Sequence, residues 1–159
     1  YGDKAAREKM HIAQCMAGMA FSNALLGIAH SLAHKTGAVF HIPHGCCNAI
    51  LLPSVIEFNA KECAERYAAI ARHIGLPGKT DEQLTNALVD SIKALNKKLD
   101  IAQTYKENGV SEEVLNEHAD AIAANAVLDP CTGSNPRKID KEQMKEVLLC
   151  AYYGTPVTF

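Results

Sequence analysis

Apolar residues recur three and four positions apart along most of the chain, which is the spacing of amphipathic helices. The first such stretch covers residues 3–34 without a proline, and Gly27 is the place where this helix is expected to break. No segment alternates apolar and polar residues for long enough to predict a strand. The pattern therefore predicts an all-α fold.

Further helices are predicted downstream. Residues 38–45 (AVFHIPHG) are expected to form a short apolar turn, followed by a helix over residues 46–60 that is apolar on nearly every side and therefore buried. Pro53 is expected to kink this helix or to end its first part. The other predicted helices cover residues 61–73, 80–99, 111–126 and 140–153, and the loops between helices include GLPGKT and DPCTGSNPRKI.

Length and composition indicate a small globular protein. The chain has 159 residues, 48% of them hydrophobic and 21% charged, with a formal net charge of −2, which predicts a single globular domain over residues 1–159. This charge offers no basic surface for nucleic acid, and no apolar run approaches the roughly 18 residues of a membrane span. The expected partners are therefore small molecules or other subunits. A helix that starts almost at residue 1 also suggests a piece of a longer protein.

The cysteine pattern favours reduced thiols. The chain has six cysteines, Cys15, Cys46, Cys47, Cys63, Cys131 and Cys150, and most of them sit inside apolar helical patterns. Adjacent Cys46 and Cys47 lack the spacing of a redox or metal motif and are predicted to be core residues, whereas Cys131 lies in a loop and is expected to be accessible. Reduced cysteines and the absence of a leader pattern predict a cytoplasmic protein.

Four of the seven histidines fall within residues 30–45. His30 and His34 are four positions apart on a helix, so their side chains share one face, within about 5–6 Å of each other. Ser31 stands where a zinc protease motif would have glutamate, which excludes that chemistry. His44 opens the next helix, where the helix dipole favours a neutral imidazole. His41 is expected to be structural or to support the site.

Three imidazoles suit a divalent metal, but the pattern places no carboxylate beside them, so the site is incomplete or shared. Two other interpretations stay open at this point. The chain could be a self-contained helical binding or assembly module whose histidines are structural, or a small metal carrier that uses His30, His34 and His44 alone.

Residues 18–60, with the run AHSLAHK and the motif FHIPHG, and residues 129–137 (DPCTGSNPR) resemble the iron-containing (group III) alcohol dehydrogenases. Together with the motif LLCAYYG at residues 148–154, these motifs are most similar to those of the alcohol dehydrogenase half of bifunctional aldehyde–alcohol dehydrogenases. The resemblance implies the C-terminal multi-helix domain of a two-domain, dehydroquinate synthase-like fold. The N-terminal dinucleotide-binding domain, which in the family supplies an aspartate and a third histidine to the metal, has no counterpart in this chain.

The same resemblance assigns roles to individual residues. His30 and His44 would be metal ligands, and His34 would face the nicotinamide and relay a proton as a catalytic residue. Phe21, Leu26 and Cys131 would line the alcohol pocket. The implied cofactors are Fe²⁺, with Zn²⁺ in some relatives, and NAD(H) or NADP(H). The implied enzyme interconverts small primary alcohols and aldehydes, acts as a homo-oligomer, and is inactive as this fragment alone.

Overall fold

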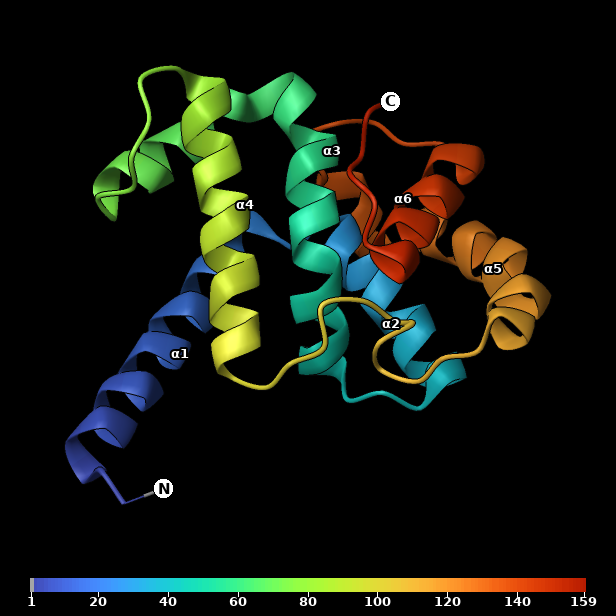
Figure 1. Ribbon diagram of the computed structural model, residues 1–159, viewed down its shortest axis with the longest axis horizontal. Coiled ribbons are helices and arrows are strands. Elements are labelled where there is room, and N and C mark those ends of the chain that lie inside the picture. Colours follow the sequence, from blue (N-terminus) through green and yellow to red (C-terminus); the bar gives the residue numbers. More distant parts are fainter. Residues whose placement is uncertain (1) are drawn as a thin grey trace.

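The computed structural model describes residues 2–159, and this part of the chain contains six α-helices, one 3-10 helix and no strand (Figure 1). The elements are α1 (Lys4–Ala24), α2 (Ile28–Phe40), α3 (His44–His73), α4 (Asp81–Lys98), α5 (Glu112–Val127), η1 (Pro130–Ser134) and α6 (Lys141–Tyr153). The all-α prediction is confirmed. No single helix among the described residues has the length and hydropathy needed to cross a membrane, and α1 and α2 reach that level only together, across a bend of 109°.

The main core lies where α2, α3, α5 and α6 meet (Figure 1). Each helix contributes fully buried apolar side chains, among them Leu32 of α2, Phe58 of α3, Leu115 of α5 and Leu148 of α6. Burying a side chain of this size contributes about 1.5–3 kcal/mol to stability. Because α2 is covered by α3, α5 and η1, it is the central element of the domain.

The first predicted helix breaks where expected, between α1 and α2. Gly27 caps α2, and a Cβ atom there would lie 2.8 Å from the Asn135 side-chain oxygen, so only glycine fits without a shift. Asn135 accepts a hydrogen bond from the Ile28 amide at the start of α2 and exchanges two hydrogen bonds with Asn59 of α3. This amide pair fixes the start of α2 against α3.

The turn predicted over residues 38–45 begins later in the structure than predicted. α2 continues through Gly37 to Phe40, and only residues 41–43 are non-helical. A Cβ on Gly37 would lie 3.2 Å from the Ile42 carbonyl oxygen, so the glycine allows the chain to fold back closely onto the helix. His41 ends α2 in the left-handed conformation, with φ 54° and ψ 36°.

The prediction that Pro53 kinks or ends its helix is also wrong. Pro53 is buried inside α3, which runs on to His73, and the non-helical residue is Cys63, with φ −143° and ψ 34°. Proline cannot donate the hydrogen bond that the Ala49 carbonyl would normally accept. The Asn96 side chain of α4 donates to that carbonyl instead, at 2.8 Å. A side chain from another helix therefore satisfies the backbone that proline leaves unpaired.

The remaining helices begin close to the predicted positions because each has a capping residue. The side chains of Thr80, Ser111 and Asp140 accept hydrogen bonds from backbone amides in the first turns of α4, α5 and α6. Asp140 and Gln143 together form a capping box. The loop predicted over residues 129–139 contains the 3-10 helix η1.

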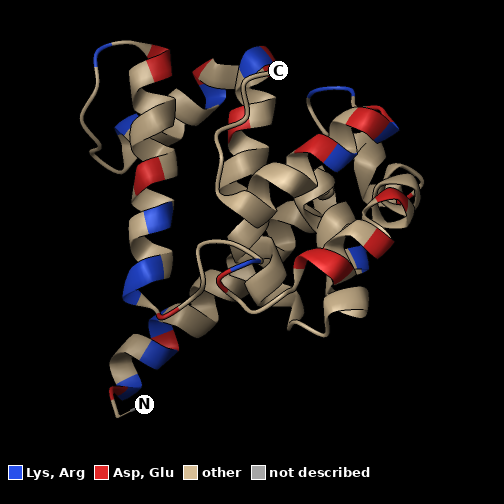
Figure 2. Ribbon diagram, turned by 45° about the vertical axis from the view of Figure 1, so that its right-hand side comes forward, with Lys and Arg blue, Asp and Glu red and all other residues tan. Residues whose placement is uncertain are grey.

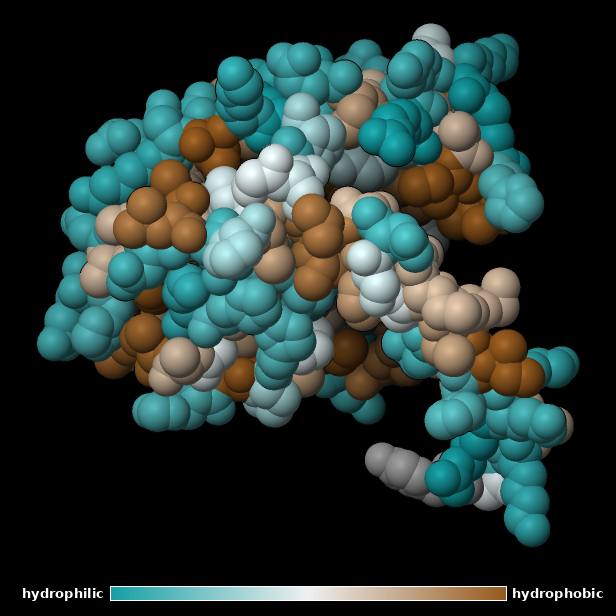
Figure 3. All heavy atoms as spheres, turned by 180° about the vertical axis from the view of Figure 1, so that it is seen from behind, coloured by the Kyte–Doolittle hydropathy of each residue, from teal (hydrophilic) through white to brown (hydrophobic). Residues whose placement is uncertain are grey.

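The cysteines are all free, and Cys15, Cys46 and Cys150 are less buried than predicted, whereas Cys131 is less accessible than predicted. Cys47 and Cys63 are buried, Cys46 packs partly against the core, and Cys131 is half-buried. Cys15 is exposed, because α1 projects from the rest of the domain and none of its residues is buried (Figure 1). The large apolar side chains exposed on α1 are Met10, Ile12, Met16, Met19 and Phe21. In Figure 3 the projecting arm of the molecule carries both hydrophobic and hydrophilic surface.

Charged residues of both signs are interspersed along the helices (Figure 2). Some of them pair between elements, with 3.3 Å between Lys93 of α4 and Glu57 of α3, and 3.0 Å between Lys145 of α6 and Asp120 of α5. Exposed pairs of this kind contribute about 0–1 kcal/mol each. The apolar core, not these pairs, therefore accounts for most of the stability.

One buried hydrogen bond ties the loop between α4 and α5 to α2. The Thr36 hydroxyl donates its hydrogen to the Leu32 carbonyl. The hydroxyl of the fully buried Tyr105 lies 2.8 Å from the Thr36 oxygen and therefore donates to it.

We expect Tyr105→Phe to lower the free energy of unfolding by about 1–2 kcal/mol, because the buried Thr36 oxygen loses its hydrogen-bond donor. Urea denaturation would measure this. Tyr153→Phe, at a position that is 47% exposed, is the control and should change stability by less than about 0.5 kcal/mol.

Candidate metal centre and active site

Three histidine rings converge where α2 passes the start of α3. The ring centroids of His30 and His44 are 5.2 Å apart, those of His34 and His44 are also 5.2 Å apart, and those of His30 and His34 are 6.1 Å apart. Two imidazoles that bind one tetrahedral ion through bonds of about 2.1 Å have ring centroids about 5 Å apart. The separation of His30 and His44 therefore fits a shared metal ion.

Ring orientation distinguishes the pair of His34 and His44 from the pair of His30 and His44. The rings of His34 and His44 are stacked with an interplanar angle of 15°, so their in-plane nitrogens lie in nearly parallel planes that do not meet at one point. The rings of His30 and His44 are tilted by 56°, which lets their planes intersect. Spacing along the helix could not make this distinction, because His30 and His34 share one face of α2.

His44 is the first residue of α3, as predicted, and follows Pro43. The Asn48 side-chain amide, one turn further on, donates to the His44 carbonyl at 3.1 Å and to His44 Nε2 at 3.0 Å. His44 Nε2 is therefore the acceptor and carries no proton in this contact. A metal ion bound at Nε2 would take the place of the Asn48 hydrogen bond. Asn48 Oδ1 is the one buried side-chain oxygen or nitrogen in the described part of the chain that lacks a hydrogen-bond partner.

The environment of His30 favours the neutral form of its ring. Burial lowers the pKa of His30, the His44 and His34 imidazoles lower the pKa further, and Asp129 acts weakly in the opposite direction. A neutral imidazole is the form that binds a metal ion. The separation and tilt of the His30 and His44 rings, together with the lowered pKa of His30, are compatible with one shared divalent ion.

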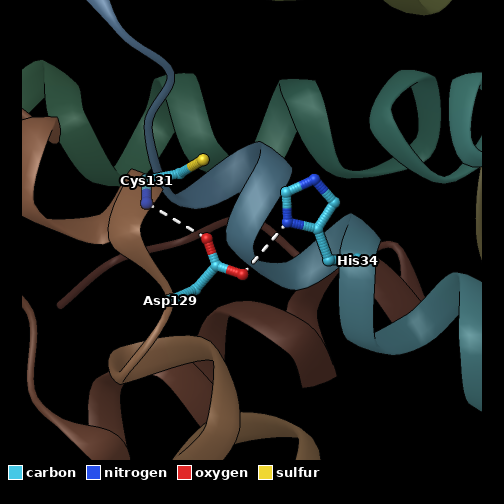
Figure 4. Close-up of side chains that lie close together, drawn as sticks. All are labelled: His34, Asp129 and Cys131. Carbon is cyan, nitrogen blue, oxygen red and sulfur yellow. Dashed lines mark hydrogen bonds and ion pairs between the residues drawn. The ribbon is translucent and has the colours of Figure 1, made fainter.

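His34 has a carboxylate partner that the sequence pattern did not place beside it. Asp129, at the start of η1, lies with Oδ2 3.0 Å from His34 Nδ1 and 2.9 Å from Lys35 Nζ (Figure 4). Its Oδ1 accepts a hydrogen bond from the Cys131 backbone amide at 3.0 Å. Burial alone would raise the pKa of Asp129, but these hydrogen bonds outweigh burial and hold the pKa well below its usual range. Asp129 is therefore a buried, charged acceptor.

Ligand-type atoms of His34, Asp129 and Cys131 lie within 4.8 Å of one another. The Cys131 backbone amide donates to the carboxylate, and the Cys131 sulfur lies within 4.8 Å of the Asp129 and His34 ligand atoms (Figure 4). Burial and the Asp129 carboxylate raise the pKa of the Cys131 thiol, which disfavours the thiolate that binds metals. Because Asp129 already accepts three hydrogen bonds, we interpret this group as a hydrogen-bonded network beside the histidines.

A cavity of about 420 Å³ opens beside His30. Leu26, Leu52 and Val55 supply apolar walls, and Asn48 adds a polar group. Of the residues predicted to line an alcohol pocket, Leu26 lies in this cavity, whereas Phe21 is 45% exposed on α1 and Cys131 lies in the neighbouring network; neither lines the cavity. Asp129 and Asn48 were not predicted as site residues. A local capping pattern marks Asp129, but nothing in the sequence links it to His34, 95 positions earlier.

Comparison with known proteins places this arrangement in a family. Residues 1–152 match the profile described as Fe-containing alcohol dehydrogenase family, C-terminal. The chain belongs to this family. The resemblance noted from the sequence is therefore confirmed, and so is the expected C-terminal helical fold.

Named relatives and solved structures agree with this assignment. The chain is 60% identical over 158 residues to an NADPH-dependent butanol dehydrogenase of Clostridium saccharobutylicum, covering 99% of this chain and 41% of that protein. It is 39% identical over 166 residues to the bifunctional aldehyde-alcohol dehydrogenase of Escherichia coli K12, covering 94% of this chain and 19% of that protein. A crystal structure of 1,3-propanediol oxidoreductase superposes with a TM-score of 0.87 at 33% identity, covering 95% of this chain and 39% of that one.

The chain thus spans about two fifths of the length of the butanol dehydrogenase and of the superposed crystal structure. The sequence motifs suggested the bifunctional enzymes, but the sequence identity to the butanol dehydrogenase is higher than the identity to the bifunctional enzyme. Both are alcohol dehydrogenases by name, and this chain corresponds to the C-terminal domain of the family.

The charged state of Asp129 predicts a dependence of stability on pH. Its pKa is below the ordinary value of 3.8 in the folded protein, so the unfolded chain takes up the proton first as the pH falls. Asp129→Asn should lower the free energy of unfolding by about 2 kcal/mol at neutral pH. The difference in the free energy of unfolding between Asp129→Asn and the parent protein should become smaller as the pH falls below about 4.

Urea unfolding at several pH values would measure this difference. Asp90→Asn, at an exposed position on α4, is the control and should show no comparable loss. A stability difference for Asp129→Asn that stays constant down to the lowest accessible pH would contradict the assignment.

Proposed function

We propose that this chain is the metal-binding helical half of an NAD(P)-dependent alcohol dehydrogenase that interconverts small primary alcohols and aldehydes by hydride transfer. The observation that carries the proposal is the convergence of His30 and His44, from two helices, at the separation that one metal ion requires. Family membership supports the same conclusion. The butanol dehydrogenase relative makes a short unbranched alcohol a reasonable first substrate to test.

His30 and His44 would hold a divalent iron, or a zinc ion in its place, through neutral ring nitrogens. When bound, such an ion supplies Lewis acidity that favours the deprotonated form of an alcohol, and the nicotinamide cofactor supplies the hydride chemistry. Two imidazoles are half of a tetrahedral ligand set. The other ligands would come from the N-terminal dinucleotide-binding domain, so the 159-residue chain by itself would be inactive.

The remaining residues would bind and orient the alcohol and move its proton. The apolar walls of the cavity beside His30, including Leu26 and Leu52, would receive the carbon chain. His34 uses Nδ1 for Asp129, which leaves Nε2 to accept the hydroxyl proton and to return it in the reverse reaction. In this proposal His34 would be the catalytic histidine and would face the nicotinamide.

Metal content of the full-length protein that carries this chain tests the proposal. His30→Ala and His44→Ala should each abolish metal retention, because two ligands from this domain cannot be reduced to one without loss of affinity. His34→Ala should retain the metal but lower alcohol turnover by about 10²–10⁴-fold. Elemental analysis of purified protein and steady-state kinetics would measure both effects.

His73→Ala, at the exposed C-terminal end of α3, is the matched control and should leave metal content and turnover unchanged. A His44→Ala protein that still holds one metal ion per chain would overturn the ligand assignment. Loss of metal from His34→Ala would mean that His34 is a ligand.

A further inference from the structure

The contact between Asp129 and His34 joins a buried carboxylate to the imidazole that the proposed reaction uses. The Asp129 side chain is 6% exposed, whereas the His34 side chain is 39% exposed. The two residues come from separate elements, η1 and α2, and the distance between Oδ2 and Nδ1 is 3.0 Å (Figure 4). A buried carboxylate thus holds one nitrogen of a partly exposed imidazole.

The chemistry of the pair determines which nitrogen carries the proton. A charged carboxylate can only accept hydrogen bonds, so His34 Nδ1 must be the donor. In a neutral imidazole the other nitrogen, Nε2, then has the free lone pair. A hydrogen bond at one ring nitrogen fixes both the tautomer and the rotation of the ring. If Asp129 were absent, His34 could exchange between tautomers and rotate about its side-chain bonds.

Two further contacts keep Asp129 in this role. Lys35 Nζ lies 2.9 Å from the same Oδ2 atom, and the Cys131 amide donates to Oδ1. Both donors stabilise the charged carboxylate and fix its plane. Asp129 therefore does not compete with Nε2 for the substrate proton but keeps Nδ1 protonated.

We propose that Asp129 is a positioning residue that holds His34 as the Nδ1–H tautomer with its ring oriented, so that Nε2 is the atom that exchanges the substrate proton. The proposal rests on the proposed dehydrogenase function. It assigns no metal or substrate contact to Asp129. The competing explanation is purely structural, in which Asp129 only anchors Lys35 and starts η1.

The test is a set of variants in the full-length protein that carries this chain. Asp129→Asn should lower alcohol turnover by about 10–100-fold while the metal content stays unchanged, because the amide can present either donor or acceptor to His34. Lys35→Met removes the ion pair but leaves the hydrogen bonds from His34 and from the Cys131 amide, and should lower turnover by less than Asp129→Asn does.

A double-mutant cycle separates the two explanations. In a His34→Gln background, Asp129→Asn should cause no further loss of turnover, because the residue through which it acts is already gone. In a Lys35→Met background, Asp129→Asn should still cause its full loss. Asp129→Glu, which restores a carboxylate, should recover part of the activity.

The His34 tautomer gives a readout that does not depend on turnover. Nitrogen-15 NMR of histidine-labelled, metal-free protein, with His34 assigned from the His34→Gln spectrum, should show the Nδ1–H form in the parent protein and in Lys35→Met. In Asp129→Asn the signal should shift toward a mixture of tautomers. The thermal midpoints of Asp129→Asn and Lys35→Met identify any loss that arises from unfolding.

Several results would overturn the proposal. These are an unchanged His34 tautomer in folded Asp129→Asn, an equal loss of turnover in Lys35→Met, a full further loss in the His34→Gln background, or loss of metal from Asp129→Asn. Failure of the proposed function looks different: the parent protein would show no alcohol turnover, and the NMR experiment would still decide whether Asp129 positions His34. If Asp129→Asn does not fold, the spectrum of Asp129→Glu decides the same question.

Discussion

The burial of one face of α2 is the constraint on which the rest of the structure depends. Ile28, Leu32 and Thr36 point into the core and are fully buried there. Successive helical residues are about 100° apart, so positions two before or after Leu32 lie on the opposite side of the helix. His30 and His34 occupy those positions, and packing of the apolar face therefore presents both rings at the opposite face, partly exposed. Hydrophobic packing thus orients residues whose chemistry is polar.

The second ligand position depends on how the chain returns after α2. The helix ends in a left-handed His41, Ile42 packs into the core, and Pro43 leads into α3 at His44. This short connection brings the first turn of α3 beside the histidine face of α2. The buried Pro53 further along α3 is accommodated because α4 supplies Asn96 to the unpaired carbonyl. α4 thereby supports the helix that carries His44 without contributing to the histidine cluster itself.

The hydrogen-bonded network around Asp129 connects the site to the second half of the chain. Asp129, just before η1, supplies the carboxylate, and α2 supplies His34 and Lys35. The Thr132 hydroxyl of η1 donates to the Ala126 carbonyl of α5 and lies 2.7 Å from the Ser31 hydroxyl of α2. The loop that carries Asp129 is therefore attached to α2 at several points. Such attachment is what allows a loop residue to hold a side chain on a helix in one orientation.

The sequence by itself determined the helical fold, most helix starts and the histidine cluster, because these depend on local spacing and on capping residues close in sequence. It also identified the family from local motifs. The tertiary structure alone decided that α2 runs on to Phe40, that Pro53 leaves α3 intact and that Phe21 lies away from the cavity beside His30. It also placed Asp129, far away in sequence, against His34. The physical reason is the same in each case: the conformation or position of these residues depends on contacts with segments that are distant in sequence. Such contacts leave no pattern among neighbouring residues.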